Sequence, residues 1–371
     1  MHEYRVMVIG GYGFFGSRLV TRLARQDGLH VIVAGRSGVA AQALVDRLQA
    51  DSRATLSHVV LDAMAAGLEA RLHRLGVALV IHTSGPFQGQ DYRVAQACAN
   101  AAVHYVDLAD GRDFVCGIET LQKSAAAHGV ILTSGASSVP ALSSAVVDRL
   151  TSGMKSIDSI DIGISPGNRT ERGLSTVAGI LSYCGKRLAT SGQERGFGWL
   201  GSYRHRYPGP VGERLLSPCD VPDLSLLPHR YAGAPVVRFG AGLELSFLHR
   251  GMNLMAWLAR LGVVDNWSVH AGRLKRAADW FKAWGTDTGA MHVTVNGRDH
   301  LGILRERAWV LVAGSGDGPF VPTLAATALV RKLASGTLAC TGARPCTGLL
   351  SLEDFMNETE GLDIQMVELQ P

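Results

Sequence analysis

Four glycines near the N-terminus have a spacing that can bind a phosphate group. In Gly10-Gly-Tyr-Gly-Phe-Phe-Gly16, the pattern Gly-x-Gly-x-x-Gly falls on Gly11, Gly13 and Gly16. The first glycine permits a tight turn, the second admits a pyrophosphate, and the third lets a helix pack closely on a strand. A predicted strand (4–9) and an amphipathic helix (17–24) flank the segment, so the sequence predicts a dinucleotide site. Its predicted residues are Gly10, Gly11, Tyr12, Gly13, Phe14, Phe15 and Gly16.

The end of the next predicted strand (30–34) indicates which dinucleotide binds. Arg36 and Ser37 follow this strand, and no acid occurs between Asp27 and Asp46. NAD sites usually place Asp or Glu here to accept from the ribose 2′-OH, whereas a guanidinium and a hydroxyl suit a 2′-phosphate. The sequence therefore favours NADP(H), bound through Arg36 and Ser37. Alternatively, Arg36 is an ordinary solvated loop residue.

Strands and helices continue to alternate up to residue 140, which predicts a doubly wound α/β domain. Further strands are predicted at 56–62, 77–81, 103–108 and 130–133. Ligands bind outside the carboxyl ends of such parallel strands. The loops there add cofactor residues, namely Asp62, Ser84, Gly85, Pro86, Phe87 and Asp107. Asp62 could equally cap a helix, and Asp107 could equally brace its loop.

Proton transfer would accompany hydride transfer from a nicotinamide. The hydride step needs mainly positioning, and a nearby carboxylate keeps an imine protonated. Asp110 is the first candidate for this role, with Asp107 in support.

Two arginines in the second half could hold an anionic substrate. Arg169 and Arg172 precede a predicted helix that starts near Leu174, and could clamp a carboxylate with help from the helix N-terminus. Alternatively, both are solvated or pair with acids such as Glu171. Arg172 is also counted among the predicted catalytic residues. The other predicted substrate-binding residues are Ser137, Ser138, Tyr203 and His205.

Beyond residue 140 the pattern predicts an α+β substrate and dimerisation domain with an open mixed sheet. Predicted strands lie at 157–164, 235–239, 243–247, 291–295 and 307–312, with helices at 174–188 and 252–261. Residues 196–231 are expected to form a lid or binding loop. The apolar run 252–258 is expected to be core, with an acyl pocket or a membrane surface as alternatives. The predicted domains are 1–140 and 141–319, with the helices of 320–371 packing back on the first.

Several blocks of the first 150 residues resemble the saccharopine dehydrogenase-like family, which includes saccharopine reductase and trans-acting enoyl reductases. The blocks are Gly10–Gly16, the Gly85-Pro-Phe87 turn, Val94-Ala-Gln-Ala-Cys98 followed by His104-Tyr-Val-Asp107, and Gly135-Ala-Ser-Ser-Val-Pro140. The resemblance implies NADPH-linked reduction of a C=N bond, or in some branches a C=C bond, by a homodimer formed partly through the second domain. Two loops depart from the family pattern: Asp110-Gly111 replaces a Gly-Glu pair, and Ser137-Ser-Val-Pro140 replaces a Gly-Asp-Pro-Gly loop. These departures disfavour saccharopine as the substrate.

Composition narrows the function classes. Of 371 residues 47% are hydrophobic, which excludes disorder, and 36 Lys+Arg against 32 Asp+Glu disfavours a nucleic acid partner. The six scattered cysteines predict neither metal nor disulfides, and no run predicts a transmembrane helix or a secretory signal. Together with the motifs and with what the resemblance implies, namely the C=N chemistry and the homodimer, these features lead us to expect a cytoplasmic, homodimeric NADP(H)-dependent oxidoreductase that acts on the C=N bond of a small anionic substrate. The alternatives are an enoyl reductase for a hydrophobic or carrier-bound substrate and a non-catalytic NADP-binding scaffold.

Overall fold

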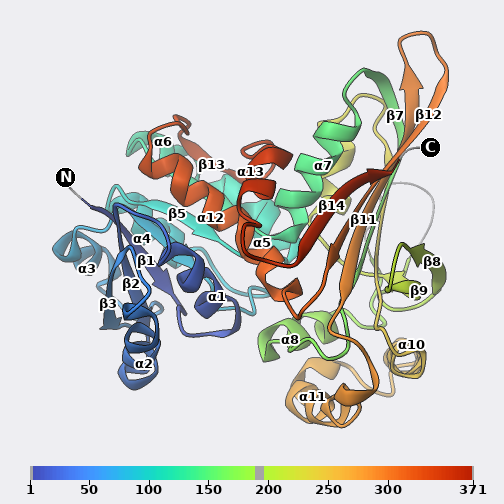
Figure 1. Ribbon diagram of the computed structural model, residues 1–371, viewed down its shortest axis with the longest axis horizontal. Coiled ribbons are helices and arrows are strands. Elements are labelled where there is room, and N and C mark those ends of the chain that lie inside the picture. Colours follow the sequence, from blue (N-terminus) through green and yellow to red (C-terminus); the bar gives the residue numbers. More distant parts are fainter. Residues whose placement is uncertain (1–2, 189–195, 370–371) are drawn as a thin grey trace. The chain divides into compact units, whose positions relative to one another are not determined.

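The computed structural model describes residues 3–188 and 196–369, which form two compact units (Figure 1). The first unit comprises Met1–Ala141 and Phe320–Leu350, and the second comprises Leu142–Pro319 and Ser351–Pro371. The sequence placed all of 320–371 with the first domain. The structure differs from Ser351 onward because the final strand pairs within the sheet of the second unit.

The first unit is built on a parallel sheet of seven strands, in the order β13-β6-β5-β4-β1-β2-β3. The strands are β1 (Tyr4–Ile9), β2 (Leu29–Gly35), β3 (Thr55–Val60), β4 (Leu79–His82), β5 (His104–Asp107), β6 (Ile131–Ser134) and β13 (Gly342–Pro345). This order confirms the doubly wound α/β fold. The sequence did not predict β13, because its Gly and Pro residues are poor strand formers that a sheet tolerates at its edge.

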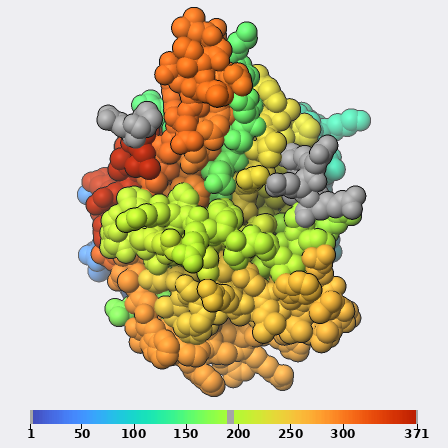
Figure 2. Space-filling model, turned by 90° about the vertical axis from the view of Figure 1, so that its right-hand side faces the viewer, coloured from blue at the N-terminus to red at the C-terminus, as the bar shows by residue number. Residues whose placement is uncertain are grey.

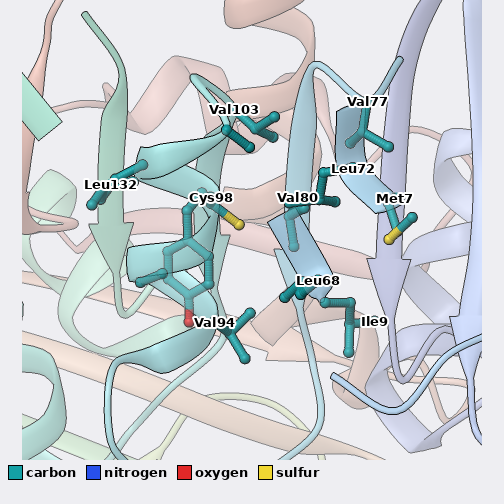
Figure 3. Close-up of a cluster of buried hydrophobic side chains, with 14 of the residues drawn as sticks. Met7, Ile9, Leu68, Leu72, Val77, Val80, Val94, Cys98, Val103 and Leu132 are labelled. Atoms are coloured by element: carbon teal, nitrogen blue, oxygen red, sulfur yellow. The ribbon is translucent and has the colours of Figure 1, made fainter. Parts of the chain in front are cut away.

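Helices pack on this sheet and bury its apolar side chains. They are α1 (Phe14–Leu23), α2 (Gly38–Gln49), α3 (Leu68–Leu75), α4 (Arg93–Asn100), α5 (Arg112–Gly117), α6 (Gln122–Ala127) and α12 (Val321–Ala334). Figure 3 shows one side of the core, where Met7 and Val80 of the sheet meet Leu72 of α3 and Cys98 of α4. Burial of each such aliphatic side chain stabilises the fold by roughly 1.5–3 kcal/mol. The sheet is therefore a rigid base for the loops at its carboxyl edge.

The second unit contains a mixed sheet of seven strands, in the order β14-β12-β11-β7-β10-β9-β8. The strands are β7 (Met154–Ser165), β8 (Tyr203–Tyr207), β9 (Gly212–Pro218), β10 (Val236–Ala241), β11 (Gly289–Asp299), β12 (Leu304–Ala313) and β14 (Ile364–Leu369). Among the strand pairs of the described residues only β7–β10 is parallel, which confirms the predicted mixed sheet. Its helices are α7 (Ser143–Leu150), α8 (Leu174–Ser182), α9 (Asp223–Arg230), α10 (Ser246–Arg260), α11 (Ala271–Asp279) and α13 (Leu352–Asn357).

The predicted loop at 196–231 is the largest error in the second half. The segment contains the β8–β9 hairpin and α9, so the expected lack of regular structure is wrong, while its role as a lid or binding loop stays a prediction. The sheet curls, because Tyr207 of β8 packs with Ala290 of β11 and Val310 of β12. The predicted strand 243–247 is also wrong, since α10 begins at Ser246. Five residues of alternating polarity fit the start of a helix as well as a strand.

A buried acid links α7 to α9 and makes the stability of the second unit pH-dependent. The Ser143 hydroxyl donates to Oδ1 of Asp223, whose Oδ2 has no partner among the described residues. Burial raises the pKa of Asp223 to about 7, although the bond from Ser143 opposes this shift. Below about pH 4 the carboxyl is protonated in both states. As pH rises from 4 to 7 the unfolded chain releases this proton first, so stability falls over that window.

Asp223→Asn is therefore expected to flatten this pH dependence. The neutral amide loses no proton. On going from pH 4 to pH 8, the free energy of unfolding of the variant should therefore rise by on the order of 2 kcal/mol relative to that of the wild type. The measurement is urea unfolding at both pH values. If the difference in free energy of unfolding between variant and wild type is the same at pH 4 and pH 8, Asp223 is ionised at no cost in the folded chain.

Candidate active site

The glycine loop between β1 and α1 leads into a helix start that no side chain caps. Gly10 has φ +77°, and its N–H donates to the Ala34 carbonyl at 2.8 Å. Gly13 is the N-cap of α1, and no side chain caps this helix. The first-turn N–H groups therefore remain available to a phosphate, and the helix dipole favours a negative charge there.

Gly16 keeps α1 close to the loop. A Cβ on Gly16 would lie 2.8 Å from both Gly11 Cα and Thr83 Oγ1, and closer still to the Gly10 carbonyl oxygen. Thr83 itself donates through Oγ1 to the Ile9 carbonyl at 2.9 Å. Thr83 thus braces the loop from the end of β4. The sequence did not single it out, because nothing in the local pattern marks this long-range contact.

Gly16→Ala is expected to weaken NADPH binding about tenfold, because overpacking displaces the loop at a cost of 1 kcal/mol or more. Fluorescence titration with NADPH measures this effect. The matched control is Gly251→Ala in α10, where a Cβ would meet nothing within 4 Å. Equal affinities in the two variants would contradict the close-packing role.

The end of β2 is connected to the glycine loop through Tyr12. The Tyr12 ring covers Gly35, whose Cβ would lie 2.5 Å from Tyr12 Cε1, and the Tyr12 hydroxyl accepts from the Ser37 N–H at 2.9 Å. Ser37 also caps α2 by accepting from the Ala40 N–H at 3.3 Å. Arg36 is exposed and has no hydrogen bond or ion pair with any described residue. Arg36 and Ser37 therefore lie beside the loop, with the guanidinium free to meet an anion.

The loop after β4 lies against the glycine loop. A Cβ on Gly10 would lie 3.3 Å from the Ser84 nitrogen. Phe87 is buried against His82 and Phe114, with ring centroids at 5.2 and 5.3 Å, so its ring packs inside the unit. Between Ser84 and Phe87, the peptide bond that connects Gly85 to Pro86 is cis. The predicted cofactor wall is thus formed by backbone, with Phe87 as its support.

Asp107 is fully buried at the end of β5 and ties two loops together. Its Oδ1 accepts from the Ala109 N–H at 3.0 Å, the Gly135 N–H at 2.9 Å and the Ser134 hydroxyl at 2.9 Å. Burial raises the pKa of Asp107 to about 6 even though these bonds lower it. This arrangement favours the loop-bracing role that the sequence left open.

Asp110, by contrast, is only partly buried and has a single side-chain partner. Gln88 Nε2 donates to its Oδ1 at 3.3 Å, and burial raises the pKa of Asp110 above its usual value. The sequence missed Gln88, although a polar residue after the Gly85-Pro-Phe87 turn was a signal. Asp110 is therefore less constrained by hydrogen bonds than Asp107, and its role in proton transfer stays a prediction.

The remaining predicted residues of the first unit have local roles. Asp62 is exposed, and its Oδ1 accepts from the Met64 N–H at 3.0 Å in a turn. The Ser137 N–H donates to the Gly135 carbonyl at 2.7 Å, and Ser138 begins a helical turn, Ser138–Leu142. These serines follow β6, at the same sheet edge as the end of β5.

In the second unit, the loop between β7 and α8 holds the two predicted arginines in different surroundings. Arg169 is exposed, and its Nη2 donates to the Ala283 carbonyl at 3.3 Å. Arg172 is mostly buried, and its Nε and Nη2 have no hydrogen-bond partner among the described residues. Burial lowers the pKa of Arg172, while Asp279 and Glu244 oppose this shift. An unpaired Nε–Nη2 edge is the geometry that binds a carboxylate through two parallel hydrogen bonds.

Glu244 is already committed to other partners. It accepts from the Asn168 N–H at 2.6 Å, the Thr286 N–H at 2.9 Å and Nη2 of Arg214 at 3.2 Å. Burial alone would raise the pKa of Glu244, but these contacts lower it overall. Glu244 is therefore an ionised anchor for the loop that carries Arg172. Sequence reasoning missed it because all its partners are distant in the chain.

Tyr203 and His205 lie in β8, inside the curl of the second sheet. His205 stacks on His292, with ring centroids 3.6 Å apart, and Nδ1 of His292 lies 3.0 Å from the Tyr207 hydroxyl. Burial, followed by His292, lowers the pKa of His205 to about 4, so the ring is neutral at pH 7. The Tyr203 hydroxyl is buried, without a partner among the described residues, and burial raises its pKa. Among the described residues, no three His, Cys, Asp or Glu side chains group to hold a metal.

Comparisons with known proteins give one family match and several similar structures. Residues 6–139 match the family described as saccharopine dehydrogenase NADP binding domain. Saccharopine dehydrogenase (L-Glu forming) from Saccharomyces cerevisiae is similar in structure, with a TM-score of 0.66, 12% identity, and coverage of 99% of this chain and 100% of that chain. An amine dehydrogenase from Mycobacterium smegmatis has a TM-score of 0.48 and 12% identity, over 93% of this chain and 96% of that chain. A search of curated protein sequences found no match.

The family match covers the glycine loop, β2 and the loops after β4, β5 and β6. The low identity to the yeast enzyme limits that likeness to the fold. Residues 6–139 thus match the saccharopine dehydrogenase NADP binding domain, and the whole chain has a fold similar to that of saccharopine dehydrogenase.

Proposed function

We propose that the chain is an NADP(H)-dependent oxidoreductase that reduces a C=N bond, or oxidises the matching amine, in a small carboxylated substrate. The observation that carries the substrate class is the unpaired, buried Nε–Nη2 edge of Arg172. A buried guanidinium edge without hydrogen-bond partners is costly, and a carboxylate ligand would supply those partners. The cofactor preference is supported by Arg36 and Ser37 at the end of β2, where no acid is present.

NADPH supplies a hydride when it is bound. The N–H groups at the start of α1 would hold its pyrophosphate, and Arg36 its 2′-phosphate. Asp110 is the proposed proton-holding residue, because its raised pKa favours a carboxyl that can keep a substrate nitrogen protonated. Asp107 positions the loops around it.

A second candidate function is C=C reduction in a hydrophobic or carrier-bound substrate. It is favoured by apolar side chains that α10 exposes, including Leu254 and Trp257. These side chains could meet an acyl chain or its carrier protein.

The test is NADPH oxidation by the purified protein with two substrate panels. One panel combines 2-oxo acids with ammonia or primary amines, and the other contains enoyl thioesters. Turnover of the imine panel alone supports the proposal, and turnover of the enoyl panel alone replaces it with the second candidate. Tight NADPH binding without turnover of either panel would indicate a non-catalytic NADP-binding protein.

A further inference from the structure

The helix α10 directs apolar side chains toward solvent. Phe247, Leu254 and Trp257 are 45%, 61% and 52% exposed, and Leu261, just after the helix, is 65% exposed. With Arg250 they form a series at intervals of three and four residues, which places them on one helical face. The outward face of α10 is therefore its apolar face.

The opposite side of α10 already packs against the unit. His249 and Ala256 are fully buried, and His249 Nε2 lies 2.9 Å from Ser217 Oγ. The expectation that 252–258 is core therefore holds for Ala256 but is wrong for Leu254 and Trp257. Both of these side chains are more than half exposed.

Aromatic residues extend this face beyond the helix. The Phe247 ring lies 5.0 Å from the Phe281 ring and 5.9 Å from the Trp284 ring, which connects α10 to the turn at Lys282–Trp284. Trp284 is 68% exposed and Trp280 is 81% exposed. Figure 2 shows the segment 246–284, coloured yellow-orange to orange, as a broad part of the surface. We call the exposed residues Phe247, Leu254, Trp257, Leu261 and Trp284 the α10 face.

Basic residues are interspersed with these side chains. The segment 246–284 contains two acids, Asp265 and Asp279, and a larger number of bases. The bases are Arg250, Arg260, Arg273, Lys275, Arg276 and Lys282. One pair is neutralised, since Lys275 Nζ lies 2.8 Å from Asp279 Oδ2. The surface around the α10 face is thus positively charged.

We propose that the α10 face binds an anionic phospholipid surface, lying in the interfacial layer of the bilayer. Trp, Phe and Leu on one helical face surrounded by Arg and Lys is the composition of interfacial helices, in which the aromatic rings enter the headgroup region and the bases meet lipid phosphates. A second copy of the chain is a poorer occupant, because a two-fold interface would place these positive charges against one another. No helix in the described part of the chain is long and apolar enough to cross a membrane, so binding would be peripheral.

The experiment is flotation of the full chain with vesicles of equal parts phosphatidylcholine and phosphatidylglycerol, compared with pure phosphatidylcholine. We expect binding to the anionic vesicles, weaker binding in 0.5 M salt because charges are screened, and quenching of tryptophan fluorescence by brominated lipids. The double variant Leu254→Ser/Trp257→Ser should need about ten times more lipid for half-maximal binding. Its fold is checked by thermal unfolding, since both side chains are exposed.

The matched control is Leu301→Ser/Leu304→Ser in the β11–β12 hairpin, where both leucines are also exposed in the same unit. The control should bind as the wild type does. The proposal is overturned if anionic vesicles bind no better than neutral ones, or if the two double variants lose binding equally. Light scattering that shows a wild-type dimer and a monomeric Leu254→Ser/Trp257→Ser variant, without vesicle binding, would instead assign the face to a second copy.

Discussion

Arg36→Ala is expected to weaken NADPH binding by about 1–3 kcal/mol and to leave NADH binding nearly unchanged. Arg36 is exposed beside the capped start of α2 and has no partner among the described residues, so its removal breaks no internal contact. Its guanidinium would meet only the 2′-phosphate, which NADH lacks. Parallel fluorescence titrations of both nucleotides measure the effect, which should appear as a loss of about 5- to 150-fold for NADPH.

Ser37→Ala provides the comparison for this experiment. The Ser37 hydroxyl caps α2, so its loss should lower stability by about 1 kcal/mol and reduce NADPH affinity less than Arg36→Ala does. If Arg36→Ala weakens both nucleotides to the same extent, the preference for NADP(H) does not arise at the end of β2.

Arg172→Ala is expected to reduce kcat/KM for a carboxylated substrate by about 100-fold, mainly through KM. A bidentate guanidinium–carboxylate pair loses both its hydrogen bonds in this variant, and Arg172→Lys should recover little because a single ammonium cannot reproduce the fork. The folded chain should not be destabilised, since Nε and Nη2 of Arg172 make no hydrogen bond within the described residues. Steady-state kinetics and thermal unfolding of the same samples test both parts.

Arg169→Ala is the matched control from the same loop. Arg169 is exposed and its guanidinium meets the Ala283 carbonyl, so the loss in kcat/KM should be less than tenfold. A fall in stability with unchanged KM for Arg172→Ala would show that Arg172 is structural and would remove the main support for an anionic substrate.

The features that the sequence predicted are those determined by nearby residues. The glycine loop, the end of β2 and the doubly wound parallel sheet all follow from short motifs and the alternation of strands and helices. The features it did not predict depend on contacts that are distant in the chain. The role of Glu244 comes from Asn168, Arg214 and Thr286, which no local pattern relates to one another.

The strands at the ends of both sheets show the same limit. Both β13 and β14 pair with strands that are far from them in sequence. Strand β8 was not predicted because it lies in a segment rich in Gly and Pro. In β8 the polar residues Arg204, His205 and Arg206 outweigh the apolar ones, so the periodicity was weak. Its pairing with β9 gives the strand its structure.

The division of the first unit between two chain segments has a consequence for synthesis. Strand β13 can join the sheet, and α12 can pack on α1, only after the whole segment Leu142–Pro319 has been synthesised. A chain still attached to the ribosome therefore presents an unpaired edge at β6 and an uncovered apolar surface, where β-rich intermediates are prone to aggregate. Closing a loop of this length costs little more entropy than closing a shorter one. The split therefore delays completion of the first unit but hardly lowers the free energy of unfolding of the finished protein. Efficient production of the protein should consequently depend on chaperones that hold the growing chain, and a fragment ending at Ala141 should be poorly soluble.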